Sequence, residues 1–241
     1  MTNFTATEIN NTLQNLANPT LAAHSLRFFK TGPGQYGEGD IFLGIRVPVI
    51  RQQVRRFRGT ALTEIEQLLI SPFHEVRLAA LLLLVELFHE KDDTSQDATY
   101  RIYLNNTKHI NNWDLVDCSA HQIVGTYLVN RSRQTLYNFA TAPSLWERRI
   151  AIIATFCFIK KDDYNDALEI SRLLLQDKED LIHKAVGWML REIGKRNEKV
   201  ERAFLDMHCQ IMPRVMLRYA IEKFPEKLRK AYMQGKVLLI E

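Results

Sequence analysis

The segment NNWDLVDCSAHQIVGTYL, which begins at residue 111, combines an aromatic ring and a carboxylate at a spacing suited to chemistry. Because residues advance about 100° each around a helix, Trp113, Asp117 and His121 fall on one stripe beside the apolar face. A tryptophan one turn before a carboxylate can form the wall of a reaction site. The alternative is a half-buried tryptophan beside an aspartate that caps the helix or pairs with an arginine.

A second candidate lies in DLIHKAVGWMLREIGKR, residues 180–196. On a helix, Trp188 falls within a row of three cations, Lys184, Arg191 and Lys195, and not at the centre of the apolar face. Cations suit phosphates and an aromatic ring suits sugars or bases, so this row fits a polyanion that carries flat groups. The alternative is a tryptophan shielded by the alkyl stems of lysine and arginine.

Arginines supply two further candidates. Arg148 and Arg149 occupy the first turn of the helix predicted at WERRIAIIATFCF. An arginine there is better placed to reach a ligand or a buried acid than to favour the helix dipole, and an ordinary Arg–Asp pair also fits.

The segment RVPVIRQQVRRFRG holds five arginines within thirteen residues and no acid. Arg51, Arg55 and Arg58 share one helical stripe, and Arg46 and Arg56 lie beside them. Uncompensated like charges usually serve a phosphate backbone, although a solvated surface face is the alternative.

The elements that must position these residues are helices. Apolar residues recur at i, i+3 and i+4 spacing, and no alternating strand pattern with hairpin turns is found, so the sequence predicts an all-α protein. The helices are expected over residues 47–57, 74–90, 113–129, 144–161, 179–195 and 213–223.

An internal repeat is visible in HEVRLAALLLL, WERRIAIIATF and IHKAVGWMLRE. Each begins with a polar turn that contains a cation and then becomes apolar. Arg77 and Arg148 are 71 residues apart and Arg148 and His183 are 35 apart, which places one further unit near Trp113. A period in the mid-thirties is typical of helical solenoids with two helices per unit. We therefore predict an α-α superhelix of tandem HEAT-like repeats that forms one domain over residues 1–241.

Composition narrows the class of protein. The 241 residues are 46% hydrophobic and 25% charged, which is enough for an ordered core, and the net charge of +4 does not by itself indicate nucleic acid. Three cysteines far apart predict no disulfide framework and a reducing compartment. No C-x-x-C or H-E-x-x-H spacing occurs, so no metal is expected.

Targeting signals are also missing. The N-terminus has no basic and apolar signal pattern, and the apolar run at residues 78–85 is too short to span a bilayer, so we expect a cytoplasmic protein with no membrane partner. Gly32, Gly34 and Gly37 match G-x-G-x-x-G, but the loop follows a helix and not a strand. An irregular surface loop is therefore the interpretation of residues 31–40.

Together these segments resemble the HEAT-like AlkD family of DNA alkylation repair glycosylases, from about residue 20 to residue 225. The specific matches are FLGIRVPVIR (42–51), WDLVD (113–117), WERR (146–149) and KAVGWMLREIG (184–194). The resemblance implies helical repeats with a basic concave face on duplex DNA that contains alkylated bases. It also implies excision of N3- and N7-alkylated purines without a metal or other cofactor, by a bacterial-type protein acting at the nucleoid. We expect a monomer with no obligate protein partner.

The resemblance also assigns roles to residues. The family's catalytic carboxylate matches Asp117, its two site tryptophans match Trp113 and Trp188, and its arginine matches Arg149, or Arg148 if the register is shifted by one residue. An aromatic residue of the second helix matches Phe28, where a tyrosine is expected, and phenylalanine has no hydroxyl to make a hydrogen bond from that position. DNA contacts are expected from the cations named above. They are Arg46, Arg51, Arg55, Arg58, Arg148, Lys184, Arg191 and Lys195.

The implied chemistry is coherent with these residue types. An N-alkylated purine already carries positive charge and leaves without a strong acid, so the difficulty is the positive charge that develops on the deoxyribose. A fixed carboxylate stabilises that charge, as in glycosidases, and aromatic walls favour a cationic base. The alternatives are a non-catalytic repeat protein that binds damaged or branched DNA, and a HEAT-type scaffold for a protein partner. Trp113 and Asp117 favour the enzyme over the non-catalytic DNA-binding protein. The row of cations around Trp188 disfavours the scaffold for a protein partner.

Overall fold

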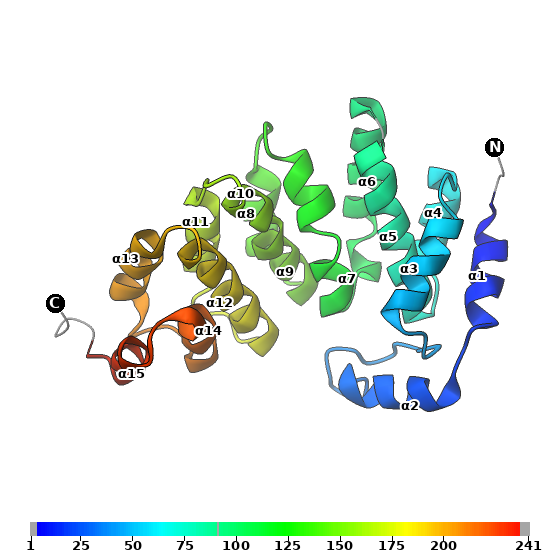
Figure 1. The fold of residues 1–241 in the computed structure, drawn as a ribbon. Helices are drawn as coiled ribbons and strands as arrows, with labels where there is room; N and C mark the ends of the chain where they lie inside the picture. The colour runs from blue at the N-terminus through cyan, green and yellow to red at the C-terminus, as the bar shows by residue number, and fades with distance from the viewer. Residues whose placement is uncertain (1–3, 91, 237–241) are drawn as a thin grey trace. The chain divides into compact units, whose positions relative to one another are not determined.

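The computed structural model describes residues 4–90 and 92–236, and within them it contains helices and no strand beyond one isolated bridge between Ile41 and Phe73 (Figure 1). The predicted all-α class is confirmed. The elements are α1 (Ala6–Gln14), α2 (Pro19–Phe28), α3 (Val47–Arg56), α4 (Leu62–Leu69), α5 (His74–Glu90), α6 (Asp93–Asn105), η1 (Thr107–His109), α7 (Trp113–Asp117), η2 (His121–Gly125), α8 (Gln134–Ala140), α9 (Leu145–Ala154), α10 (Phe156–Ile159), α11 (Asn165–Leu173), α12 (Asp180–Gly194), α13 (Glu198–His208), α14 (Arg214–Ala220), η3 (Ile221–Lys223) and α15 (Glu226–Gln234).

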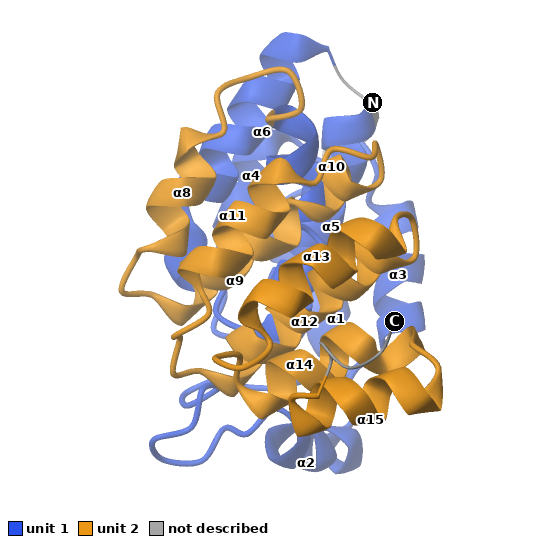
Figure 2. Ribbon diagram, turned by 90° about the vertical axis from the view of Figure 1, so that its left-hand side faces the viewer, with its two compact units in different colours: residues 1–127 blue, residues 128–241 orange. Residues whose placement is uncertain are grey.

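The chain divides into two compact units, residues 1–127 (unit 1) and 128–241 (unit 2), which Figure 2 distinguishes by colour. Helices close in sequence pack together within each unit. In unit 1, α5 packs against α3, α4 and α6, and in unit 2, α12 packs against α9, α13 and α14. A single domain over residues 1–241 stays a prediction, and residues 1–3, 91 and 237–241 of that range lie outside the described residues.

Each unit has a central helix whose sequence explains its burial. The apolar run at residues 78–85 is buried all along α5, because apolar residues surround this helix on every side. In α12 the buried residues follow helical spacing, and Gly187 lies where α14 comes closest. A Cβ on Gly187 would overlap the backbone oxygen of Met216, so glycine permits this close approach of the two helices.

The three side chains that reveal the repeat, Arg77, Arg148 and His183, make the same contact. Arg77 Nη1 donates to the carbonyl of Ser71 at 2.9 Å and Arg148 Nη1 donates to that of Ala142 at 3.0 Å. His183 Nε2 lies 2.6 Å from the carbonyl oxygen of Asp177. Each side chain thus bonds to the backbone six residues before it, which supports the alignment of the three segments.

Two of the predicted helices are interrupted. The helix expected over 113–129 ends at Asp117, and a wider turn follows in which the Gly125 amide bonds to the Ala120 carbonyl. The helix expected over 144–161 is divided into α9 and α10. A buried hydroxyl competes for a helix carbonyl at each break: Ser119 Oγ donates to Leu115 O at 2.6 Å, and Thr155 Oγ1 donates to Ile152 O at 2.6 Å.

Candidate functional site

An aromatic cluster surrounds the start of α7 in unit 1. The Trp113 ring stacks on Phe29, with centroids 5.4 Å apart, and meets Phe28 edge to face at 6.0 Å. Phe29 also stacks on Phe42 at 4.9 Å. Phe28 is 59% exposed and Trp113 is half-buried, so the cluster is partly open to solvent. It can offer an aromatic surface to a ligand while its inner rings support Trp113.

The segment FLGIR holds α2 and α5 around this cluster. The backbone amides of Leu43, Gly44 and Ile45 donate to the buried Glu75 carboxylate at 2.8, 2.7 and 3.2 Å. Gly44 has a φ of +77°, and a Cβ there would overlap the Asn18 carbonyl oxygen at the start of α2. Glycine is therefore required both for the backbone conformation and for the contact with α2.

A network of buried charges lies beneath the aromatic cluster. His74, at the start of α5 and 2% exposed, faces two carboxylates: Nδ1 lies 3.2 Å from Asp40 Oδ2, and Nε2 lies 2.8 Å from Asp114 Oδ2. Arg77 Nη2 donates to Asp40 Oδ1 at 2.6 Å. The amides of Asn111 and Asn112 donate to the same carboxylate at 3.2 Å each. Four donors thus satisfy Asp40.

These contacts fix the protonation states. Burial alone would raise the pKa of Asp40, but the hydrogen bond from His74 and the charges of Arg77 and His74 lower it to about 2. Burial alone would lower the pKa of His74, but the charge and hydrogen bond of Asp114, joined by those of Asp40, raise it to about 9. At neutral pH the ring is an imidazolium with both nitrogens donating to carboxylates.

Asp117 lies half-buried at the end of α7. Burial raises the pKa of the neighbouring Cys118 thiol, the charges of Asp114 and Asp117 raise it further, and the charge of Arg51 opposes them. Arg51 of α3 is therefore close enough to the end of α7 for its charge to act there. The structure brings a carboxylate, an aromatic wall and a cationic helix together within unit 1.

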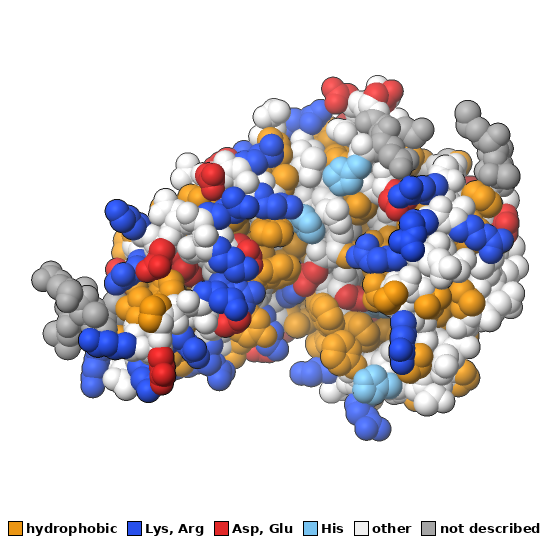
Figure 3. Space-filling view, viewed as in Figure 1, with side chains coloured by type: hydrophobic (Ala, Val, Ile, Leu, Met, Phe, Trp, Pro, Cys, Tyr) orange, Lys and Arg blue, Asp and Glu red, His pale blue; other side chains and the backbone are white. Residues whose placement is uncertain are grey.

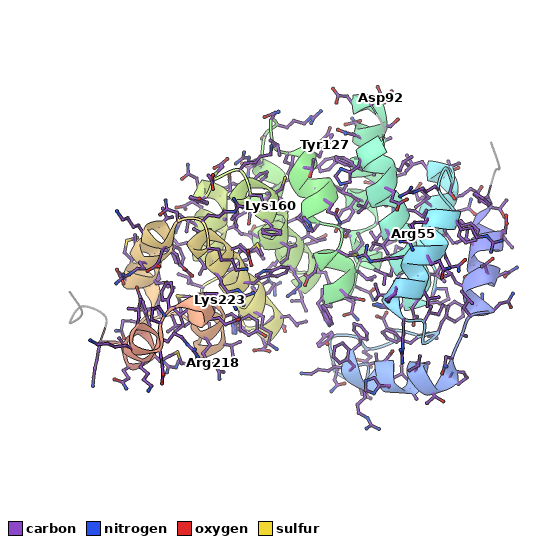
Figure 4. The ribbon with its side chains drawn as sticks, in the orientation of Figure 1. Arg55, Asp92, Tyr127, Lys160, Arg218 and Lys223 are labelled. Atoms are coloured by element: carbon purple, nitrogen blue, oxygen red, sulfur yellow. The ribbon has the colours of Figure 1, made fainter. Side chains whose placement is uncertain are left out.

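Arginine side chains gather over α3 in Figure 3, and Figure 4 shows Arg55 on this helix. Arg46, Arg51 and Arg55 are exposed, and within residues 4–90 and 92–236 no acid lies at ion-pair distance from them. Arg58 differs from the prediction. Because α3 ends at Arg56, Arg58 lies beyond the helical stripe, and its Nε pairs with Glu86 of α5 at 2.6 Å.

Trp188 in unit 2 has a different setting. Its Nε1 donates to Glu192 at 3.0 Å, and its ring is 6.0 Å from that of Phe156, over which Lys160 Nζ lies at 4.6 Å. The cations of its row are paired with acids. Lys184 pairs with Asp180 at 2.6 Å, Lys195 pairs with Glu192 at 2.6 Å, and Arg191 pairs with Glu222.

The two arginines of WERR have separate environments. Arg148 pairs with Asp177, with Nε 2.6 Å from Oδ2, as the Arg–Asp alternative anticipates. Arg149 is 5% exposed and its Nη1 donates to the Leu181 carbonyl. The predicted catalytic residues are thus divided between the units: Trp113 and Asp117 belong to unit 1, and Arg149 and Trp188 belong to unit 2.

Sequence reasoning missed the residues that support α7. Phe29, Phe42, His74 and Asp40 were not singled out, since none belongs to a spacing that indicates chemistry. One signal was available: the 31–40 loop ends in Asp40, and the helix that begins at His74 opens with the cation-containing turn of the repeat.

Other candidate features lie elsewhere or were not found. A cavity of about 370 Å³ in unit 1 is bordered by Arg58, Thr60 and Glu86, and no member of the aromatic cluster lines it. Among the described residues, no group of three or more His, Cys, Asp or Glu side chains is arranged to hold a metal ion. No helix in that part of the chain is long and apolar enough to cross a membrane.

Fold and site define an all-α protein of serially packed helices that carries an aromatic cluster and a carboxylate beside an arginine-rich helix. The family model of the DNA alkylation repair enzymes matches residues 9–224, so the chain belongs to that family. This membership supports a role in alkylation repair, with DNA as the substrate.

A solved structure from Enterococcus faecalis, described as a predicted DNA alkylation repair enzyme, is similar in fold. The TM-score is 0.69 at 18% identity, and the similarity covers 87% of this chain and 97% of that one. The α-α superhelical class predicted from the sequence is confirmed by this likeness. No curated protein sequence matches the chain.

Proposed function

We propose that the protein is a DNA glycosylase that excises cationic N3- and N7-alkylated purines from duplex DNA. The observation that carries the proposal is α7, which holds Trp113 in the aromatic cluster one turn before Asp117, with the charge of Arg51 acting at the end of the helix. An enzyme that breaks an N-glycosidic bond needs a negative charge beside the sugar and a surface that favours a flat cation, and α7 provides both.

The role assigned to the Asp117 carboxylate is to stabilise the transition state. As the bond from C1′ to the alkylated base lengthens, positive charge develops on the deoxyribose, and a fixed anion stabilises it more than it stabilises the ground state. The base leaves with the bonding electrons and loses its positive charge, so it needs no strong acid. Asp117 can also orient the water that attacks C1′.

The role assigned to the aromatic side chains is to bind the alkylated base. Trp113 and the exposed Phe28 present π-faces that attract a cationic base and sugar C–H groups. Phe28 has no hydroxyl, so its contribution is stacking alone. Trp188 and Arg149 of unit 2 are proposed, each within that unit, to contribute an aromatic surface and a phosphate contact to the binding of DNA, and one N–H of the Arg149 guanidinium is used by Leu181.

Phosphate contacts are assigned first to α3, where Arg46, Arg51 and Arg55 carry uncompensated positive charge. We further propose a HEAT-like architecture with a basic concave face, action as a monomer in the cytoplasm, and no cofactor.

Excision by Asp117→Asn tests the function most directly. The substitution keeps the shape and removes the charge, so release of N7-methylguanine from a duplex with one such base should slow by about 10²-fold or more. DNA affinity should change little, because an acid near phosphates provides no attraction. Asp162→Asn is the matched control, since Asp162 is an exposed aspartate with a φ of +59° that asparagine also tolerates, and its excision should equal wild type.

Melting temperature separates catalysis from structural damage. Lost excision with unchanged melting and binding supports the proposal. Lost excision with a large fall in melting temperature favours a structural aspartate. If Asp117→Asn excises the base at the wild-type rate, Asp117 is not the catalytic carboxylate. If the wild-type protein binds alkylated DNA and releases no base, it belongs with the non-catalytic binders.

A further inference from the structure

The helix that carries the proposed catalytic pair is too short to hold itself in place. α7 has five residues, fewer than two turns, and an isolated helix of that length is unstable in water. Three residues in turns, 118–120, separate it from the wide turn of η2. The directions of Trp113 and Asp117 must therefore be set by contacts from other elements.

The contacts at the start of α7 converge on two buried side chains. Asn112, the residue before the helix, donates through its amide to Asp40 at 3.2 Å, and its Oδ1 accepts from the Trp113 amide at 2.9 Å. Asp114, in the first turn, accepts from His74 Nε2 at 2.8 Å. A carboxylate at this end also suits the helix dipole.

His74 joins these contacts into one support. Its ring bridges Asp40 and Asp114, which lie 34 residues before it and 40 residues after it, and stacks on Phe42 with centroids 4.5 Å apart. The ring of Phe29, on which Trp113 stacks, has its centroid 5.1 Å from that of His74. The charged groups around the ring are Asp40 from the 31–40 loop, Asp114 from α7, and Arg77 from α5, which reaches the ring through Asp40.

We propose that His74 is the positioning residue of the excision site: it joins the end of the 31–40 loop to the first turn of α7 and so fixes the directions of Trp113 and Asp117. The inference rests on the proposed function and gives the glycine-rich loop a role, which is to deliver Asp40. His74 is 2% exposed and acts only through α7.

The test compares His74→Gln with His89→Gln, an exposed histidine in the last turn of the same helix. Glutamine is uncharged and cannot donate to two carboxylates in opposite directions. His74→Gln should slow single-turnover excision by about 10-fold or more, because small displacements of reacting groups are costly. DNA affinity should stay within about 3-fold, since the phosphate contacts are unchanged. His89→Gln should behave as wild type.

Amide hydrogen exchange gives a readout that does not depend on activity. In His74→Gln, exchange at residues 113–120 should accelerate while exchange in α13 stays at the wild-type rate. Equal acceleration throughout the chain would mean general destabilisation and would overturn the proposal, and so would wild-type excision and exchange. If the wild-type protein releases no base, the proposed function fails, and the exchange comparison still decides whether His74 positions α7.

Nitrogen NMR of the histidine ring keeps the proposal testable if His74→Gln does not fold. In the wild-type protein both ring nitrogens of His74 should be protonated at pH 7.5. Asp114→Asn, which keeps an acceptor oxygen and removes a charge, should lower the pKa of His74 and slow excision several-fold. A neutral His74 ring in the wild-type protein at pH 7.5 would overturn the proposal.

Discussion

The two units differ in which of their charged side chains have partners. Unit 1 leaves the arginines of α3 uncompensated at the surface and satisfies its buried Asp40 with four donors. Unit 2 pairs the cations of α12 with acids and buries Glu201 of α13, 2% exposed, with no hydrogen-bond partner for Oε1 in the described part of the chain. Both rows are basic, but the α12 segment contains acids that pair with its cations and the α3 segment contains none, so only the α3 row keeps its charge available for phosphates.

The largest expected effect concerns the buried charges at the repeat positions. Arg77→Met should lower the free energy of unfolding by about 3–5 kcal/mol, because it leaves the Asp40 carboxylate in unit 1 short of a partner. Arg148→Met, at the corresponding position of unit 2, should cost less, since the Arg148 side chain is 16% exposed against 6% for Arg77. Urea unfolding followed by circular dichroism measures both. An equal cost for the two variants would contradict the contrast.

Glu201 gives the second effect, which depends on pH. Burial and the charge of Glu198 raise the pKa of Glu201 to about 8, against the opposing charge of Arg191. The folded form therefore binds its proton more tightly than the unfolded form, so stability is highest below about pH 4.5 for this group and falls until about pH 8. The loss should amount to about 2–4 kcal/mol.

Glu201→Gln isolates that loss. In this variant the part of the decline that Glu201 causes should disappear, so stability should no longer fall between pH 4.5 and 6.5, and stability at pH 8 should equal or exceed that of wild type. The contribution of His74, whose pKa is about 9, should remain: it is present below pH 6.5 and lost as pH rises through 9. Unfolding at a series of pH values measures both, and an unchanged decline in Glu201→Gln would show that Glu201 is not its cause.

The third prediction tests the α3 row. Arg51→Ala with Arg55→Ala should weaken binding of duplex DNA by about 10-fold at low salt, and should reduce the slope of log affinity against log salt by about 1.8, because each lost phosphate contact retains its counterion. Binding titrations at several salt concentrations measure it. An unchanged slope would place this row away from the DNA.

The smallest effect is expected from the α12 row. Lys184→Ala with Lys195→Ala should change affinity by less than about 3-fold, since acids already neutralise these cations. Asp180→Asn sharpens the contrast, because it frees Lys184 and should strengthen binding slightly. A salt slope that falls as far as in the α3 variant would mean that the α12 pairs open to admit phosphate, and the contrast would be lost.

Local periodicity predicted much of the fold. The six expected segments contain α3, α5, α7, α9, α12 and α14, whereas α4, α11 and α13 were not among the predicted helices although each buries an apolar stripe. The two interruptions, after Asp117 and at Thr155, were not predicted. Each depends on a buried hydroxyl that takes a carbonyl from the helix ladder, and a serine or threonine in a sequence does not reveal whether it will be buried.

The sequence by itself determined the all-α class, the repeat positions and the place of Trp113 one turn before Asp117, because these depend on spacings of a few residues along one helix. The pairs of Lys184 with Asp180 and of Lys195 with Glu192 are also local, whereas only the tertiary structure decided which charges are compensated from another element. Glu86 meets Arg58 from 28 residues away and Glu222 meets Arg191 from 31 away, and His74 finds its two carboxylates in two other elements. Coulomb energies depend on distance in space and on burial, and neither is set until the helices pack.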